Sequence, residues 1–252
     1  MKVVVISDIH IFGADDPLYA SLLALMREEL APGDHFVLAG DIFDFLVGNQ
    51  PGLNARYADF FAELRKIGDS GVRTTYIEGN HDFHLKKVFS DLPNLRVVDE
   101  ETEIDLPTKR IYVAHGDLVD REDRGYLALR AFFRSPVIRF TAYALPERAV
   151  EWIGTRSSDA SRKRAPRLPE SRGPDHLDRL RAKFRDFAEK KFRAGFDAIV
   201  LGHCHDLDGK DFSSGGRTGR YLNVGFPRVH QSYVVFTEDE GLVRRPLRRF
   251  DH

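Results

Sequence analysis

Five short apolar runs recur along the chain, at residues 3–6, 36–39, 74–77, 111–114 and 198–201. They are rich in β-branched and aromatic residues and are bounded by glycine or polar residues, a pattern that predicts buried strands. Residues 18–30 and 57–67, which separate the first three runs, are longer and favour helices. This alternation of strands and helices is typical of α/β folds.

The remainder of the chain adds further strands and one clear helix. Short strands are expected at residues 95–98, 103–106, 221–224, 232–237 and 241–244. Between positions 177 and 187, apolar side chains recur at three- and four-residue spacing, which predicts an amphipathic helix. Strands at both ends of the chain with helices between them indicate two packed sheets covered by helices.

Each of the five apolar runs ends at residues of metal-ligand type. These clusters are Asp8-Ile9-His10, Gly40-Asp41, Gly79-Asn80-His81-Asp82, His115-Gly116-Asp117 and Gly202-His203-Cys204-His205. Since ligands collect beyond the carboxyl ends of strands in open sheets, the five clusters are expected to meet at one rim. One such motif alone would more often be a turn or a helix cap, but five in succession at strand ends indicate a site.

The residue types in these clusters specify the chemistry. On an extended backbone, residues two apart point to the same side, which pairs Asp8 with His10 and His203 with His205. Carboxylate, amide and imidazole ligands suit Mn²⁺, Fe²⁺ or Zn²⁺, and the shortage of thiolates argues against a closed structural zinc site. Cys204 is expected to be a packed core thiol. An open, catalytic two-metal centre is the favoured interpretation.

Composition limits the alternatives. A chain of 252 residues with 42% hydrophobic content fits one α/β domain with an elaboration. The net charge of -1 gives no general attraction to nucleic acid, so no nucleic-acid partner is expected. The single cysteine excludes an internal disulfide framework, and no apolar leader or long apolar span is evident. The expected location is therefore the cytoplasm.

Residues 121–172 break the alternating pattern and resemble an insertion. They hold twelve Arg and Lys residues against six Asp and Glu residues, a surplus of six positive charges within a chain of net charge -1. They also carry many aromatic and aliphatic side chains. This composition suits a lid that meets an acyl chain and an anionic headgroup, or lies on an anionic membrane. It equally suits an ordinary helical pair with an apolar core stripe and solvated arginines.

The order Asp-x-His, Gly-Asp-x-x-Asp, Gly-Asn-His-Asp, His-Gly-Asp and Gly-His-x-His resembles the calcineurin-like metallophosphoesterase superfamily, from Asp8 to His205. The resemblance implies a four-layer αββα sandwich, formed by a single domain over residues 1–252 with a helical cap at residues 121–175. It implies two divalent ions, most suitably Mn²⁺, with Fe²⁺ or Zn²⁺ as alternatives, and an activated water that attacks phosphorus. The implied ligands are Asp8, His10, Asp41 and His205 for one ion and Asp41, Asn80, His115 and His203 for the other.

His81 and Asp82 are the candidate catalytic residues beside these ligands. In the superfamily the histidine of Gly-Asn-His-Asp points at the phosphoryl oxygens or the leaving group, and the resemblance implies that Asp82 or another carboxylate steadies the His81 ring. A histidine suits this role because its pKa lies near working pH. The alternative is that His81 caps the turn and is solvated.

Within the superfamily, the chain is most similar to the UDP-2,3-diacylglucosamine pyrophosphatases of lipid A biosynthesis. The similarity rests on residues 40–48, on His115-Gly116-Asp117 and on the spacing of the residues after it. It implies cleavage of a nucleotide-linked lipid to UMP and 2,3-diacylglucosamine 1-phosphate, peripheral contact with the inner membrane, and no obligate protein partner. The implied substrate-binding residues are Asp123, Tyr126, Phe132, Phe133, Arg156, Arg162, Lys163 and Arg164.

His81 departs from that family, which usually carries arginine at this position. The departure keeps a general metallophosphoesterase, either a phosphodiesterase or a protein phosphatase, as the alternative function. A nuclease would need a continuous basic track, whereas the basic surplus here is interleaved with apolar bulk. A non-catalytic scaffold would be expected to have lost ligand residues, and every ligand position is filled.

Overall fold

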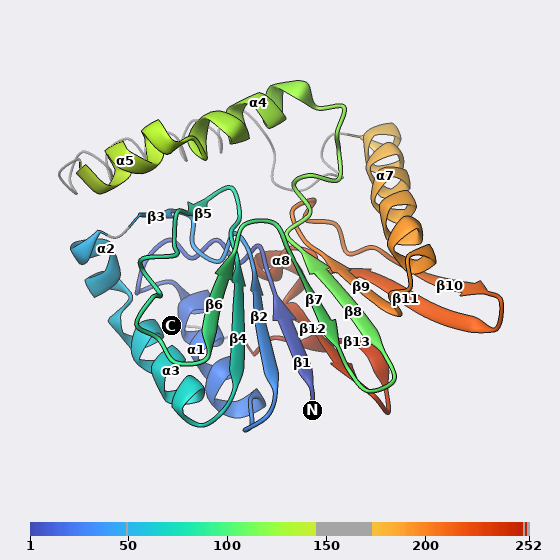
Figure 1. The fold of residues 1–252 in the computed structure, drawn as a ribbon, viewed down its shortest axis with the longest axis horizontal. Coiled ribbons are helices and arrows are strands. Elements are labelled where there is room, and N and C mark those ends of the chain that lie inside the picture. Colours follow the sequence, from blue (N-terminus) through green and yellow to red (C-terminus); the bar gives the residue numbers. More distant parts are fainter. Residues whose placement is uncertain (49, 145–172, 249, 251–252) are drawn as a thin grey trace.

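The computed structural model describes residues 1–48, 50–144, 173–248 and 250, and two large sheets form its centre (Figure 1). The first sheet has six strands in the order β13-β12-β1-β2-β4-β6. Its members are β1 (Val3–Ile6), β2 (His35–Ala39), β4 (Arg73–Ile77), β6 (Leu95–Val98), β12 (Ser232–Thr237) and β13 (Gly241–Pro246). The strands β1, β2, β4 and β6 run parallel, so their carboxyl ends share one edge.

The second sheet has five strands in the order β10-β11-β9-β8-β7. Its members are β7 (Glu101–Asp105), β8 (Arg110–Ala114), β9 (Ala198–Leu201), β10 (Gly209–Ser214) and β11 (Arg217–Asn223). The strands β8, β9 and β11 are parallel, which brings the residues after β8 and β9 to one rim. A small parallel pair, β3 (Leu46–Val47) with β5 (Asp82–Phe83), lies beside that rim.

Helices cover the outer faces of both sheets. The helices are α1 (Pro17–Glu29), α2 (Pro51–Arg56), α3 (Ala58–Asp69), α4 (Arg124–Phe133), α5 (Pro136–Ala144), α7 (Pro174–Arg193) and α8 (Pro227–His230). In Figure 1, α1 and α3 lie beside the first sheet, α7 lies beside the second, and α4 and α5 extend across the rim where the parallel strands end. No helix in the described ranges is long and apolar enough to span a bilayer.

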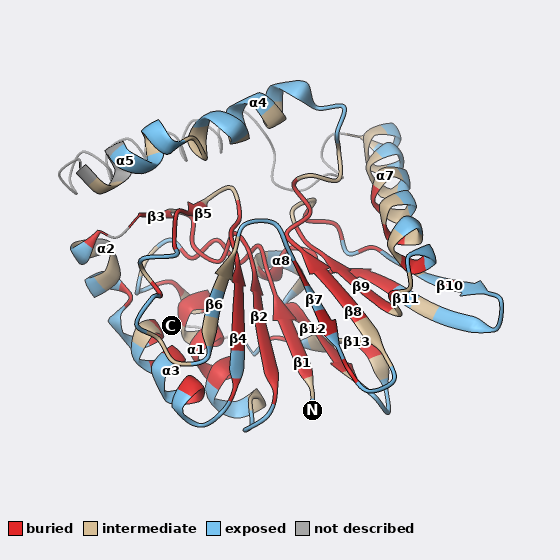
Figure 2. Ribbon diagram, viewed as in Figure 1, coloured by how far each residue is buried: buried red, intermediate tan, exposed pale blue. Residues whose placement is uncertain are grey.

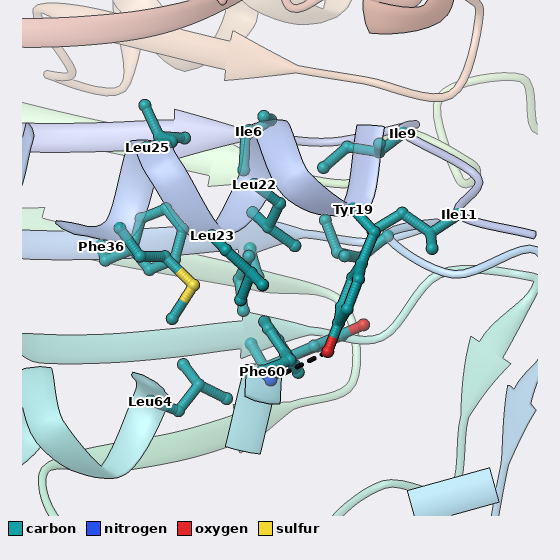
Figure 3. Packing of buried hydrophobic residues seen from close by; sticks show 14 of the residues in the cluster. Ile6, Ile9, Ile11, Tyr19, Leu22, Leu23, Leu25, Phe36, Phe60 and Leu64 are labelled. Carbon is teal, nitrogen blue, oxygen red and sulfur yellow. Dashed lines mark hydrogen bonds between the residues drawn. The ribbon is translucent and has the colours of Figure 1, made fainter. Parts of the chain in front are cut away.

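Three buried clusters correspond to the three interfaces of four layers. Along β1, Val4 and Ile6 face the helices, whereas Val3 and Val5 face the second sheet, as the two-residue period of a strand requires. Figure 3 shows the first interface, where the Tyr19 hydroxyl accepts a hydrogen bond of 3.0 Å from the backbone N–H of Phe60. The third cluster packs α7 against the second sheet. The expected αββα sandwich is confirmed.

The strands and helices that were expected agree with the structure to within a few residues, but the short elements β3, β5, α2 and α8 were not expected, and the hairpin of β10 and β11 was expected only in part. The hairpin of β10 and β11 was expected only as a strand at residues 221–224. β10 is mostly exposed, with only Phe212 buried, and residues 217–220 of β11 are exposed or half-buried and mostly polar, so the hairpin carries little apolar signal. Figure 2 shows this contrast, with the exposed hairpin projecting beyond the buried central strands.

Candidate metal centre

The loops that carry the predicted ligands share an unusual backbone conformation. Asp8, His10, Asp41, His203 and His205 all have positive φ values, between 51° and 68°. The extended backbone expected at these residues was therefore wrong, because each lies in the left-handed region, although Asp8 and His10 still share one group of potential ligands. Non-glycine residues in that region are uncommon and cost about 1–3 kcal/mol each. Strain repeated at one rim indicates that the fold holds these side chains for function rather than for stability.

Asp8, His10 and His205 form the first group of potential ligands. Nε2 of His10 lies 3.2 Å from Nε2 of His205, and Nε2 of His205 lies 3.4 Å from Oδ1 of Asp8. Phe226 stacks on the His205 ring, with centroids 4.6 Å apart and planes within 6°. The two imidazoles and the carboxylate thus point their donor atoms at a common position, and Phe226 fixes one ring.

The second group gathers Asp41, Asn80, His115 and His203. Nε2 of His115 lies 3.1 Å from Oδ1 of Asn80 and 3.3 Å from Nδ1 of His203. Oδ2 of Asp41 lies 3.7 Å from Nε2 of His115. The structure therefore brings all seven predicted ligands together in two adjacent groups. His203 and His205 belong to different groups, as the family resemblance implied, although they were expected to point to the same side.

The buried carboxylates at this rim favour the binding of cations. Burial alone would lower the pKa of His115, but the carboxylates of Asp41 and Asp8 raise it to about 9. Burial also raises the pKa of Asp8, yet its hydrogen bond with His205 and the charge of His115 lower it below its usual value. Buried carboxylates of this kind need positive charge nearby. With oxygen and imidazole donors in both groups, the residues fit two divalent ions.

Two glycines allow the loops to approach this closely. A Cβ atom on Gly79 would lie 2.2 Å from Oδ1 of Asp41, and one on Gly202 would lie 2.4 Å from Oδ2 of Asp8. Real Cβ atoms do not approach other atoms this closely, so any side chain would displace a ligand carboxylate. These glycines are therefore part of the site's geometry.

Asp82 lies beneath the site and does not contact the His81 ring. Its carboxylate accepts hydrogen bonds from the backbone N–H of Asp41 at 2.9 Å and of Ile42 at 2.7 Å, and from the Tyr76 hydroxyl at 2.6 Å. Burial and then the charge of Asp41 raise the pKa of Asp82 to about 7. Asp82 thus supports the loop that carries Asp41. The expectation that it steadies the His81 ring was wrong.

His81 lies at the edge of the first ligand group. Its ring centroid is 4.8 Å from that of His10, and its Nδ1 lies 2.9 Å from the carbonyl oxygen of Asp44. His10, Asp44 and His81 also present ligand atoms close to one another. A backbone carbonyl, rather than Asp82, orients this ring. Since the carbonyl accepts the Nδ1 proton, Nε2 is the ring nitrogen left for a further partner.

The candidate substrate-binding residues in the described part of the expected cap do not all lie at the site. The Asp123 carboxylate caps α4 by accepting the backbone N–H of Tyr126 at 2.9 Å. Tyr126 lies at the metal centre, because its ring centroid is 5.5 Å from that of His203 and its hydroxyl donates to Asp117 at 3.0 Å. Phe132 is 58% exposed, whereas Phe133 packs against Phe83. Arg156, Arg162, Lys163 and Arg164 lie outside the described residues.

Two arginines anchor α4 to the centre. Arg130 donates to Asp117, and Arg134 donates to the Glu78 carboxylate at 3.0 Å and to the Gly79 carbonyl at 3.0 Å. Charge-assisted hydrogen bonds are stronger than neutral ones, so these contacts fix α4 next to the loop that carries Asn80. The sequence placed both arginines in the expected cap but did not predict these partners.

Helix α7 holds the loop that follows the last ligand. Arg181 binds the buried Asp206 with contacts of 2.7 and 2.9 Å, and Arg185 binds the buried Asp208 with contacts of 2.9 and 2.6 Å. Lys183 on the same helix binds Asp120, the residue just before the expected cap, at 2.7 Å. The four-residue spacing of the arginines and the Asp-x-Asp that follows His205 were the available sequence signal, and sequence reasoning missed it.

Residues 1–207 of the chain match the family model described as calcineurin-like phosphoesterase. UDP-2,3-diacylglucosamine hydrolase from Escherichia coli O81 (strain ED1a) is 30% identical over 146 residues, which cover 58% of this chain and 60% of that protein. The chain thus matches less than two thirds of that relative's length. The protein of the same name from Xanthomonas axonopodis pv. citri (strain 306) is 29% identical over 229 residues, which cover 89% of this chain and 91% of that protein.

Among solved structures, Yfce, a phosphoesterase from E. coli, matches with a TM-score of 0.43 and 16% identity. The match covers 98% of this chain and 100% of that one.

Proposed function

Because the chain belongs to the calcineurin-like phosphoesterase family, we propose that it hydrolyses the pyrophosphate of UDP-2,3-diacylglucosamine. The products would be UMP and 2,3-diacylglucosamine 1-phosphate. Two relatives with this hydrolase name, at about 30% identity, support the choice of substrate, and one of them aligns along most of the chain. These names belong to the two relatives, and we propose the same substrate for this chain.

Family membership implies divalent metal ions, and we propose that two are bound, with Mn²⁺ as the preferred metal. Asp8, His10, Asp41 and His205 would hold one ion, and Asp41, Asn80, His115 and His203 the other. When bound, such a pair polarises phosphoryl oxygens and lowers the pKa of a water molecule toward neutrality. The chain's own contribution is to fix seven donors on strained loops, so that little rearrangement is needed when substrate arrives.

His81 is proposed as the group that donates to the phosphoryl oxygens or the leaving group. Its Nδ1 faces the Asp44 carbonyl, which favours the tautomer protonated at Nδ1 and assigns contact with the substrate to Nε2. Protonation of the ring would make Nε2 a donor as well. Asp82 is proposed to act only through the Asp41 loop that it supports.

The observation that carries the lipid assignment is the position of α4. This helix is anchored beside the metal ligands through Tyr126, Arg130 and Arg134, yet it also presents large apolar side chains to solvent. The exposed apolar side chains of α4 and α5 are Leu129, Phe132, Val137 and Phe140. Exposed apolar groups concentrated on one element mark a binding surface. Acyl chains are a suitable partner when the headgroup lies at the metals.

We extend the cap proposal to residues 121–175, within a single domain of residues 1–252. The basic residues Arg156, Arg162, Lys163 and Arg164 are proposed to bind the diphosphate or the nucleotide, for which arginine is well suited. A lipid substrate would place the protein in the cytoplasm, in peripheral contact with the inner membrane.

A paired assay tests the substrate. Purified, Mn²⁺-loaded protein is given UDP-2,3-diacylglucosamine, and bis-p-nitrophenyl phosphate as a generic diester. The proposal expects rapid UMP release and slow diester cleavage. Diester cleavage without lipid turnover would support the second candidate, a general metallophosphoesterase, which the histidine at position 81 favours.

A further inference from the structure

A group of polar side chains, buried at His35 and Thr75 and exposed at Arg73 and Arg96, borders the core between the two sheets at the end of the strands opposite the metal centre. Val37 of β2 is aligned with Thr75 of β4, which is aligned with Arg96 of β6. Two residues earlier, His35 is aligned with Arg73. Residues two apart on a strand share a face, so all five belong to the face that Val37 packs against the second sheet. Apolar residues would be expected there.

These polar residues line a pocket of about 440 Å³ between the first sheet and β7. Its lining residues include His35, Arg73, Thr75, Asn94 and Arg96, together with Glu103 and Asp105 of β7. The volume lies within the range of small-molecule sites. His35 begins β2 and Asp41 follows its end, so the pocket lies about 20 Å from the metal centre at the usual rise per residue. The pocket is therefore separate from the proposed active site.

His35 is the buried polar group of this pocket. It is 6% exposed, and its Nε2 lies 2.9 Å from the Thr75 hydroxyl. Its Nδ1 is buried and has no hydrogen-bond partner within the described ranges. Buried polar atoms are nearly always satisfied, so an unpartnered one in a native fold indicates a missing water, ion or ligand.

The two arginines of the pocket lack acidic partners among the residues that the structure describes. Arg73 contacts the Met1 sulfur, and Arg96 contacts the hydroxyls of Thr75 and Thr102. The nearby acids Glu103 and Asp105, on the opposing strand β7, are both bound by Arg110 at 3.2 and 3.1 Å. The charges of both arginines act on the buried His35 ring, while the two carboxylates of β7 are each paired with Arg110.

We propose that this pocket binds a phosphate group, either free or carried by a small metabolite, between Arg73, Arg96 and the His35 ring. Guanidinium groups present paired N–H donors that match phosphate oxygens, and the threonine hydroxyls supply further donors. The anion would also pair with Nδ1 of a protonated His35. In the absence of an anion, burial and then the charges of Arg73 and Arg96 hold the pKa of His35 at about 4.

NMR titration of the His35 ring in Zn²⁺-loaded protein tests the site, since Zn²⁺ is diamagnetic and phosphate at the metal centre leaves this remote ring unaffected. Inorganic phosphate is expected to raise the pKa of His35 in a saturable way, because the anion offsets the two arginine charges. Arg73→Gln and Arg96→Gln should each weaken phosphate binding about tenfold, the loss expected for one charged hydrogen bond. Both side chains are exposed, so the variants should fold.

Arg220→Gln is the matched control, because it removes the same charge from an arginine that is already paired with Asp211. Its phosphate affinity should equal that of the unaltered protein. A parallel titration with glycerol 3-phosphate separates the two sources, since tighter binding than inorganic phosphate indicates a phosphorylated metabolite and weaker binding indicates the free anion. A His35 ring that does not respond to phosphate, or equal affinity in Arg96→Gln, would overturn the proposal in favour of an ordered water.

Discussion

Oδ2 of Asp41 lies 3.7 Å from Nε2 of His115. The same oxygen lies 3.7 Å from Nε2 of His10, which belongs to the other ligand group. The other oxygen of this carboxylate accepts the backbone N–H groups of Asn80 and His81 at 2.8 and 2.9 Å. One oxygen thus faces both groups while the other is held by the backbone, an arrangement that suits a bridging ligand.

Replacement of Asp41 by alanine should remove both ions, because each would lose a shared carboxylate. Metal content after dialysis, measured by atomic emission, should fall from two ions per chain to none. Asp211→Ala is the control, since it removes an acidic residue from the exposed hairpin. Retention of two ions by Asp41→Ala would rule out the bridge.

Replacement of His81 by alanine should leave the metal content intact and lower kcat. Positioned proton donors contribute about 10²–10⁴-fold to rate, and a loss within this range is expected. The measurement is kcat beside metal content on the same preparation. If the metal content falls instead, His81 is a ligand in the group with His10 and Asp44.

Sequence patterns predicted the layers of this fold well, because its parallel strands are short, apolar and bounded by polar loops. They also identified the seven side chains that converge at the rim. They did not predict how these residues lie, since the left-handed backbone at Asp8 and His205 depends on loop contacts between distant strands. The role first assigned to Asp82 failed for the same reason, because its partners come from a neighbouring strand and loop.

Long-range ion pairs were the other feature beyond reach of the sequence. Arg181 and Asp206 are 25 residues apart, and Arg134 and Glu78 are 56 apart. A surplus of arginines cannot show which of them meet buried carboxylates. From composition alone, residues 121–172 suited a lid and an ordinary helical pair equally well. The lid is now favoured, because α4 is anchored beside the ligand residues while its apolar side chains are exposed.

Replacement of Arg181 by lysine should weaken metal binding about tenfold, a typical loss when a residue that supports a metal ligand is changed. Lysine keeps the charge but cannot reproduce the paired contact with Asp206, so the loop after His205 should loosen. The measurement is a metal-binding titration, with the melting temperature recorded alongside. Arg220→Lys, which alters a similar pair on the exposed hairpin, should leave metal affinity unchanged. Equal metal affinities in the two variants would show that Arg181 serves stability alone.

Phe132 and Phe133 should respond differently to replacement by aspartate. Phe132 is exposed, so Phe132→Asp should raise KM for the diacylated substrate without altering the melting temperature or the cleavage of a small diester. Phe133 packs against Phe83, so Phe133→Asp should lower the melting temperature. An equal rise of KM for lipid and diester in Phe132→Asp would argue against an acyl contact.

His35 should make stability depend on pH below neutrality. Its pKa is lowered to about 4 in the folded protein by burial and by Arg73 and Arg96, so the unfolded chain binds its proton first as pH falls. The contribution of His35 to the free energy of unfolding is fully present above about pH 6.5. It is lost as the pH falls toward 4, by up to about 3 kcal/mol. The measurement is the free energy of unfolding by denaturant, determined for the protein and for His35→Gln at several pH values in this range. If the free energy of unfolding of His35→Gln falls with pH as steeply as that of the unaltered protein, other groups cause the effect.

The most direct test of the proposed reaction is hydrolysis of UDP-2,3-diacylglucosamine in water enriched with ¹⁸O, followed by mass spectrometry of both products. We expect turnover that depends on divalent metal, with one ¹⁸O atom in UMP and none in 2,3-diacylglucosamine 1-phosphate, because attack occurs at the UMP phosphorus. Label in the lipid phosphate would contradict the direction of attack. Absence of turnover by metal-loaded protein that still cleaves bis-p-nitrophenyl phosphate would contradict the proposed substrate itself.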